Sequence, residues 1–149
     1  MPLKIIHIVL RLILGGMLVY GGFAKFSKPV PEPTQIIEQV QKGEDLTSNI
    51  DLLKMRNYIF GMKQTGYFWP FLGIVEFLAG ILLLSQVFGA LGAIVALPVT
   101  LNIFLFHFFL KPGDMPGLLQ TLGLLAINIW LIAAAYSRWK PLLIDKKIW

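Results

Sequence analysis

The sequence predicts an all-α fold: a four-helix transmembrane bundle with antiparallel neighbours and short amphipathic helices in the loop between the first two spans. Hydrophobic residues make up 56% of the chain and charged residues only 14%. The hydrophobic residues fall in four blocks, each close to the roughly 20 residues that cross the 30 Å hydrocarbon layer as a helix. Proline, glycine and charged residues gather between the blocks. We therefore expect one membrane domain over residues 1–149.

The composition also excludes several kinds of chemistry. The chain has no cysteine, which excludes disulfides, thiolate catalysis and cysteine-ligated metal or iron–sulfur centres. Basic residues outnumber acidic ones by 13 to 8, but they lie mostly at the ends of apolar blocks, as lipid head groups and membrane orientation require. We expect membrane lipids as partners and no nucleic acid. No metal-ligand spacing, nucleotide fingerprint or Ser–His–Asp order is found, so no metal site is predicted.

The first span covers about residues 5–24. Arg11, Gly15, Gly22 and Lys25 fall on one helical face, and the two glycines allow another helix to approach closely. Arg11 either faces the bundle interior or snorkels from a packing face, and we favour the interior. The block also has features of a signal peptide, which the arginine inside it disfavours.

A polar insert, residues 26–66, separates the first two spans. Its start is rich in proline and extended. A short amphipathic piece follows Thr34, and residues 50–64 are predicted as one or two helical pieces along the membrane surface. The insert is either a lid over the bundle or an ordinary surface connection.

The second span covers about residues 67–84, with Glu76 as its only charge. A mid-membrane carboxylate costs on the order of 3 kcal/mol, and eleven Phe, Leu, Ile and Val residues offset it by about 5 kcal/mol. The segment can therefore insert. Gly73 and Gly80 lie one turn to either side of Glu76 and permit close helix packing there.

The third and fourth spans cover about residues 88–110 and 118–136. A very short turn precedes the third span, so spans two and three form an antiparallel hairpin. Pro98 is expected to kink the third span. Each span carries an asparagine, Asn102 and Asn128, and a basic, aromatic tail follows the fourth.

Counting residues from one membrane surface places Arg11, Glu76, Asn102 and Asn128 near the midplane. The offset between Arg11 and Glu76 is then roughly 5 to 6 Å, within reach of a guanidinium. We predict an Arg11–Glu76 pair, direct or through water. The polar layer either locks the bundle in register or forms a proton or ligand site.

His107 lies near the end of the third span, at the level of Lys25. The two are predicted either to form a polar mouth for an anionic or quinone-like head group, or, for His107, to be an interfacial histidine only. His7 lies about 25 Å away in depth, so the two histidines cannot ligate a single haem within one subunit.

Five segments, taken in order, resemble the DoxX-like family of small four-helix membrane proteins. They are Arg11-x-x-Leu14-Gly15-Gly16, residues 21–26 (GGFAKF), residues 65–84 (TGYFWPFLGIVEFLAGILLL), residues 102–113 (NIFLFHFFLKPG) and residues 138–143 (RWKPLL). The resemblance covers all four spans. It implies a multi-pass protein of the bacterial inner (cell) membrane with cytoplasmic termini, which the count of basic residues alone does not decide. It also implies that Arg11, Gly22, Lys25, Glu76 and His107 match recurrent positions of the family.

Three functions remain open. Some relatives are associated with quinone-reducing membrane oxidoreductases, which implies an accessory subunit of such an enzyme or of a redox-homeostasis complex, with a bound quinone or lipid and a soluble or membrane redox partner. The alternatives are a small transporter or lipid-binding protein using the Arg11–Glu76 layer, and a structural or assembly factor without ligand. Independent electron transfer is disfavoured because the sequence has no complete redox centre. No catalytic residue is assigned, and a homo-oligomer remains open.

Overall fold

The computed structural model describes residues 2–27, 34, 38, 41–42 and 50–143. These residues contain helices and no strand, so the predicted all-α class is confirmed. In chain order the helices are α1 (Pro2–Ala24), α3 (Ile50–Gln64), α4 (Phe68–Leu84), α5 (Gly89–Leu110), α6 (Met115–Ala134) and α7 (Tyr136–Leu143).

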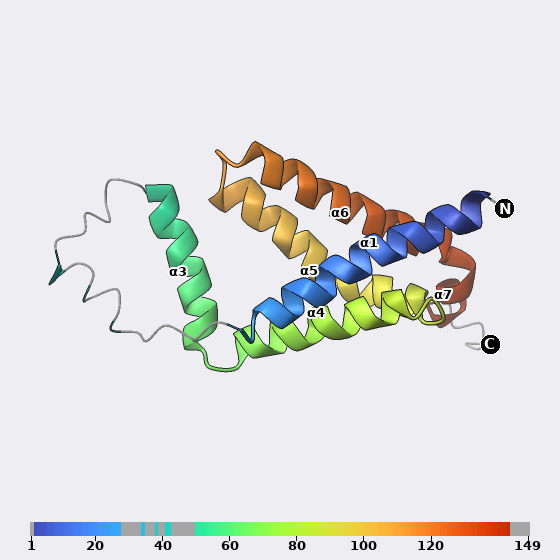
Figure 1. The fold of residues 1–149 in the computed structure, drawn as a ribbon, viewed down its shortest axis with the longest axis horizontal. Helices are drawn as coiled ribbons and strands as arrows, with labels where there is room; N and C mark the ends of the chain where they lie inside the picture. The colour runs from blue at the N-terminus through green and yellow to red at the C-terminus, as the bar shows by residue number, and fades with distance from the viewer. Residues whose placement is uncertain (1, 28–33, 35–37, 39–40, 43–49, 144–149) are drawn as a thin grey trace, which may run out of the picture.

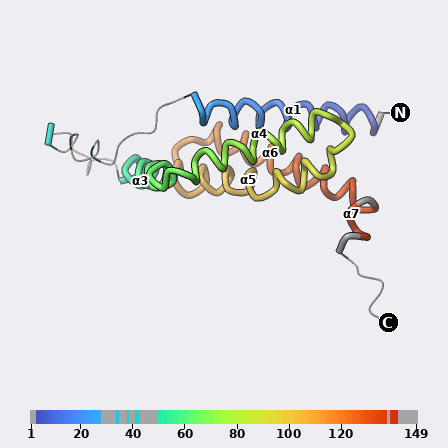
Figure 2. Tube along the Cα trace, turned by 90° about the horizontal axis from the view of Figure 1, so that it is seen from below, coloured from blue at the N-terminus to red at the C-terminus, as the bar shows by residue number. Residues whose placement is uncertain are grey.

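Four long helices form the bundle. Helix α1 packs on α4, α4 on α5, α5 on α6, and α6 returns to α1. Neighbours run antiparallel, as predicted (Figure 1). Helix α1 begins at the end of the bundle where α7 lies, and α3 lies at the opposite end (Figure 2). The start of α1 and the end of α6 therefore lie at the same end of the bundle.

Three described helices are long and apolar enough to cross a membrane: Leu3–Ala24, Gly89–Leu110 and Met115–Ala134. Helix α4 is shorter, with 17 residues, and passes the same test only together with α3, from which it bends by 90°. Large apolar side chains cover the outside of the bundle, including Trp130, which is 53% exposed. Such an outer surface suits lipid as the solvent.

The two hairpin turns have local causes. Between α4 and α5, Gln86 has a φ of 59°, which reverses the chain within a few residues. Between α5 and α6, Asp114 caps α6 because its Oδ1 accepts a hydrogen bond from Gly117 N at 3.0 Å, and Pro116 occupies the first turn, where its missing N–H is not needed.

The four glycines predicted to pack helices do so between α1 and α4. A Cβ added to Gly22 would lie 2.7 Å from Gly73 O, and one added to Gly80 would lie 2.7 Å from Gly15 O. No side chain fits there, so the two backbones lie in direct contact. The Gly15–Gly80 and Gly22–Gly73 pairs fix the register of the two helices.

Helix α3 crosses the far end of the bundle instead of extending it. The prediction of a helix over residues 50–64 is confirmed, and Gly66, with a φ of 74°, supplies the bend before α4. The short piece predicted after Thr34 lies mostly outside the described residues, although Glu38 N donates to Thr34 O at 2.9 Å. The sequence did not predict α7, which residues 136–143 form.

Candidate functional site

A cavity of about 220 Å³ lies between α3 and the bundle. We call it the α3 cavity. Its lining comprises Lys25, Tyr58, Ile59, Met62, Trp69, Leu72, Glu76, Asn102, Ile103, Phe106 and His107. Four of the six predicted site residues are in this list, and Arg11 and Asn128 are not.

An ion pair forms the polar centre of the cavity. Lys25 Nζ donates to Glu76 Oε2 at 2.6 Å. The glutamate side chain is 2% exposed and the lysine side chain 15%. Glycine at position 21 makes room for the carboxylate, because a Cβ there would lie 3.2 Å from Glu76 Oε2. A charge so deep in the bundle is tolerated because it is paired.

Trp69 lies beside the ion pair and close to two ammonium groups. Lys25 Nζ is 5.3 Å from the centre of the indole ring, and Lys63 Nζ, from α3, is 4.9 Å from it. Both distances fit cation–π attraction. The indole thus connects the surface helix to the ion pair of the bundle.

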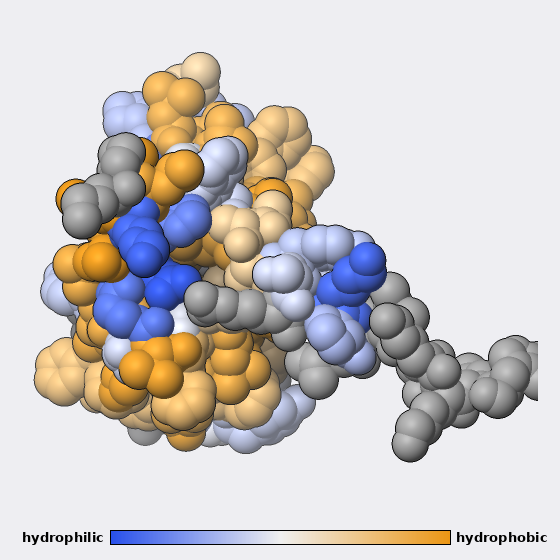
Figure 3. All heavy atoms as spheres, turned by 90° about the vertical axis from the view of Figure 1, so that its right-hand side faces the viewer, coloured by the Kyte–Doolittle hydropathy of each residue, from blue (hydrophilic) through white to orange (hydrophobic). Residues whose placement is uncertain are grey.

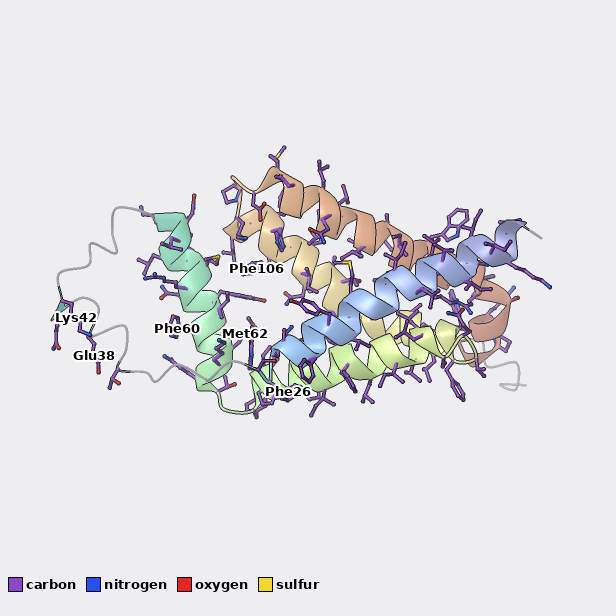
Figure 4. All side chains as sticks on the ribbon, in the orientation of Figure 1. Phe26, Glu38, Lys42, Phe60, Met62 and Phe106 are labelled. Atoms are coloured by element: carbon purple, nitrogen blue, oxygen red, sulfur yellow. The ribbon has the colours of Figure 1, made fainter. Side chains whose placement is uncertain are left out.

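Helix α3 is also attached to α5. Tyr58 Oη donates to Asn102 Oδ1 at 2.9 Å, and the Tyr58 ring lies 5.7 Å from the Phe106 ring. Met62 points from α3 toward the bundle and Phe106 points from α5 toward α3, whereas Phe60 points to the other side of α3 (Figure 4). Of the predicted insert, α3 is thus the part that lies against the bundle at this cavity.

His107 connects the cavity to the turn before α6. Its Nδ1 lies 3.0 Å from Ile103 O, and its Nε2 lies 3.9 Å from Asp114 Oδ2. Hydrogen bonds from Lys111 and from Gly117 N hold the pKa of Asp114 below its usual value of 3.8. His107 is therefore a member of the cavity wall with an acidic neighbour on its outer side.

The predicted Arg11–Glu76 pair is wrong. Arg11 Nη1 donates to Gln86 O at 3.0 Å, at the opposite end of α4, and Glu76 pairs with Lys25. Gln86 is ten residues beyond Glu76, or roughly 15 Å along a helix. The count of residues from one membrane surface assumed that the end of α1 and the start of α4 lie at the same depth. The glycine contacts between the two helices set a different register. Arg11 instead lies at the bundle end where α1 begins, where hydrophilic residues gather among hydrophobic ones (Figure 3).

Asn128 is buried, 0% exposed, but it does not join a layer with Glu76. In the orientation that satisfies both ends of its amide, Nδ2 donates to Ala93 O at 2.9 Å, and Oδ1 accepts from Thr100 Oγ1 at 2.9 Å and Leu97 N at 3.1 Å. Ala93 O and Leu97 N are the carbonyl and amide groups of one helical turn. The amide thus bridges one turn of α5 just before Pro98 and has a structural role there.

The sequence did not single out Tyr58 or Lys63, although both contact the site. Tyr58 and Lys63 belong to a segment whose position across the bundle is a tertiary feature. The two residues are five positions apart, which at about 100° per residue separates them by about 140° around α3. No helical period therefore groups them, and nothing in the sequence identifies their partners. Among the described residues no three His, Asp or Glu side chains gather as a metal site would need.

Together, the apolar spans and the buried ion pair under α3 define a helical membrane protein with a largely apolar pocket that holds one ion pair at one end of its bundle. The DoxX family model matches residues 6–109, from early in α1 to the end of α5. The chain belongs to the DoxX family. No curated protein and no solved structure matches it significantly.

Proposed function

We propose that this DoxX protein is an accessory subunit of a quinone-linked membrane oxidoreductase or redox-homeostasis complex, and that the α3 cavity binds the quinone head group. The observation that carries the proposal is the Lys25–Glu76 pair at 2.6 Å in a cavity with otherwise largely apolar walls. Small-molecule sites commonly combine apolar walls with a few convergent polar groups.

The donors of the cavity match the chemistry of a quinone. A quinone ring presents two carbonyl oxygens, which accept hydrogen bonds. The ammonium of Lys25 and the amide nitrogen of Asn102 are donors in the cavity wall. The indole of Trp69 and the ring of Phe106 offer faces for stacking. A cavity of about 220 Å³ is suited to one substituted ring.

Electrons for such a ring would come from a partner protein. The chain has no cysteine, and the sequence contains no complete redox centre. The proposal therefore includes a soluble or membrane redox partner. It also places the protein in the bacterial inner membrane with both termini in the cytoplasm, so the α3 cavity opens toward the outer surface.

The transport hypothesis loses its basis because it used an Arg11–Glu76 site. A lipid in place of a quinone remains an outcome of the test, since a lipid head group would use the same donors. An assembly factor without ligand is the remaining outcome.

Native mass spectrometry of the full chain extracted in lipid nanodiscs tests the proposal. We expect a bound molecule with the mass of a quinone. Lys25→Gln should reduce its occupancy at least about tenfold, as expected when one charged hydrogen-bond donor worth on the order of 1.5 to 3 kcal/mol is lost. Lys140→Gln is the matched control, because Lys140 lies on α7 over Tyr136, at the other end of the bundle.

Each result has a distinct meaning. A bound phospholipid that Lys25→Gln removes would replace the quinone by a lipid. A partner subunit without any bound small molecule would favour the assembly factor. Equal quinone occupancy in Lys25→Gln and Lys140→Gln would contradict the role of the α3 cavity. The same spectra report the number of chains in a complex.

A further inference from the structure

A groove lies where α5, α6 and α7 meet, at the opposite end of the bundle from α3. We call it the α7 groove. Its volume is about 430 Å³. Three of its residues share one face of α6 at helical spacing, and four of the six are aliphatic. The lining comprises Leu97, Ile129, Ile132, Ala133, Tyr136 and Trp139.

Trp139 holds α7 in the position that forms the groove. Its Nε1 donates to Ile132 O at 2.8 Å, close to the end of α6, and α7 turns away from the direction of α6 (Figure 2). The Trp139 ring lies 4.9 Å from the Tyr136 ring in an edge-to-face arrangement. The bond to Ile132 uses the one hydrogen-bond donor of the indole. The indole therefore offers only apolar surface to an occupant of the groove.

An ammonium group lies at the outer end of this apolar wall. Lys140 Nζ is 5.4 Å from the centre of the Tyr136 ring, a distance that fits cation–π attraction, and the residue is exposed. At the other end of the groove, Leu97 lies eight residues after the start of α5, or roughly 12 Å along the helix. An apolar wall that ends at a cation matches the acyl chain and head group of an anionic phospholipid.

The charge of this end of the bundle also favours an anion. Among the described residues the acidic side chains are Glu38, Asp51, Glu76 and Asp114, and none of them belongs to α7 or to the start of α1. In the sequence, residues 1–12 and 138–149 together hold six basic residues and one acidic residue, Asp145. Basic clusters that directly follow a membrane span attract anionic lipids. The basic residues are Lys4, Arg11, Arg138, Lys140, Lys146 and Lys147.

We infer that the α7 groove binds one anionic phospholipid, with an acyl chain against Ile129, Ile132 and Ala133 and its head group beside Lys140. The acyl chain gains little by moving from the bilayer to the groove, because both are apolar. The preference for one lipid over another therefore comes from the head group, which the groove holds next to the ammonium. The site does not share a residue with the α3 cavity, so it is independent of the proposed quinone.

Brominated phospholipids test the inference, because bromine atoms on an acyl chain quench a tryptophan that they contact. The full chain with Trp139 as its only tryptophan is placed in phosphatidylcholine vesicles. Dibrominated phosphatidylglycerol, which is anionic, or dibrominated phosphatidylcholine, which is zwitterionic, then replaces the host lipid in steps. A protein with Trp130 alone is the reference, since Trp130 is 53% exposed on the outside of α6 and does not line the groove.

We expect phosphatidylglycerol to associate at Trp139 about fivefold more strongly than phosphatidylcholine, which is the preference that one lysine near a membrane surface provides. At Trp130 the two lipids should differ by less than about twofold. Equal association of the two lipids at Trp139 would overturn the inference.

Two variants in the background with Trp139 alone locate the lipid. Lys140→Gln should remove the preference for phosphatidylglycerol, whereas Lys54→Gln should keep it, because Lys54 lies on α3 and is 59% exposed. Ala133→Phe fills the groove and should also remove the preference. Its matched control is Ala126→Phe, at an exposed position seven residues earlier on α6, which should have no effect. A preference that persists in Lys140→Gln or in Ala133→Phe would overturn the inference.

A further measurement does not depend on the folding of a variant. The unmodified protein is mixed in detergent with equal amounts of phosphatidylglycerol and phosphatidylcholine and is examined by native mass spectrometry. We expect one phosphatidylglycerol per chain to remain bound at collision energies that remove phosphatidylcholine. Equal retention of the two lipids would overturn the inference, and it would leave the proposed quinone site unaffected.

Discussion

Lys25 and Glu76 form an ion pair at 2.6 Å across α1 and α4, and the two residues differ in how deeply they are buried. The carboxylate is enclosed in the bundle, with its side chain 2% exposed, whereas Lys25 directly follows α1 and its side chain is 15% exposed. Removing one partner therefore has unequal consequences for the other.

Lys25→Met should destabilise the protein by about 3 to 5 kcal/mol, because it leaves a buried carboxylate without its partner. Glu76→Gln should cost less, since the Lys25 side chain can extend to the lipid head groups. The free energy of unfolding in bicelles measures both. The double variant should recover part of the loss from Lys25→Met. Equal losses in the two single variants would show that the burial difference has no energetic effect.

The glycine contacts between α1 and α4 predict that two glycines of α1 differ in how much stability is lost when alanine replaces them. Gly22→Ala should destabilise the bundle by about 1 to 3 kcal/mol, because the new methyl group would overlap the Gly73 carbonyl at 2.7 Å. Gly16→Ala is the matched control, since a Cβ there meets nothing within 4 Å. Thermal unfolding in detergent measures the stability of both variants. A loss in Gly16→Ala as large as in Gly22→Ala would contradict the packing account.

Those same glycines explain which part of the fold the sequence could predict. The spans were predictable because about 20 consecutive apolar residues suit the hydrocarbon layer and little else. Their register was not, because the ends of adjacent helices need not lie at one depth. Pairing Gly15 with Gly80 and Gly22 with Gly73 in the sequence would have placed Glu76 opposite residue 19, six residues from Lys25 and eight from Arg11. Side chains tilt toward the N-terminus of their own helix, which brings Lys25 and Glu76 together and turns Arg11 away.

The candidate site was predictable only in part, and for a related reason. A polar mouth of Lys25 and His107, inferred from their common depth, was one of two alternatives, beside an interfacial histidine only, and both residues line the α3 cavity with Glu76 and Asn102. Tyr58 reaches Asn102 from a helix that is remote in sequence. That contact depends on the 90° bend between α3 and α4, which no local pattern specifies.

The contact between Tyr58 and Asn102 predicts that α3 loosens when the hydrogen bond is lost. Tyr58→Phe removes the hydroxyl and keeps the ring beside Phe106, so we expect a loss of about 0.5 to 1.5 kcal/mol in local stability. Hydrogen exchange of the α3 amides should become faster, by up to about tenfold, while exchange in α6 stays unchanged. Tyr67→Phe, at an exposed position before α4, is the control. Unchanged exchange in α3 would show that other contacts hold the helix.

Asn128→Leu should destabilise the bundle by about 1 to 3 kcal/mol, because Ala93 O and Leu97 N lose the amide that bridges them. Asn102→Leu provides a comparison, since Asn102 bonds to the exposed Tyr58 and its loss should cost less. Unfolding in bicelles measures both. A larger loss in Asn102→Leu would contradict the assignment of Asn128 to a structural role.

The turn between α5 and α6 predicts a pH effect. The pKa of Asp114 is lowered in the folded protein by Lys111 and by Gly117 N. Its contribution to stability is therefore present above its usual value of 3.8 and is lost as the pH falls through the lowered pKa. Asp114→Asn, which can still cap the helix, should flatten the acid limb of stability below pH about 4. An unchanged acid limb in the variant would exclude this contribution.

The most direct test of the quinone site compares two tryptophans in the same membrane. Proteins with Trp69 alone or Trp130 alone are titrated in nanodiscs with a long-tailed benzoquinone. Trp69 lines the α3 cavity and Trp130 is 53% exposed on the outside of α6. We predict saturable quenching of Trp69 at low quinone content and a gradual, unsaturated decrease for Trp130. Identical unsaturated quenching of both would contradict the presence of a quinone site in this cavity.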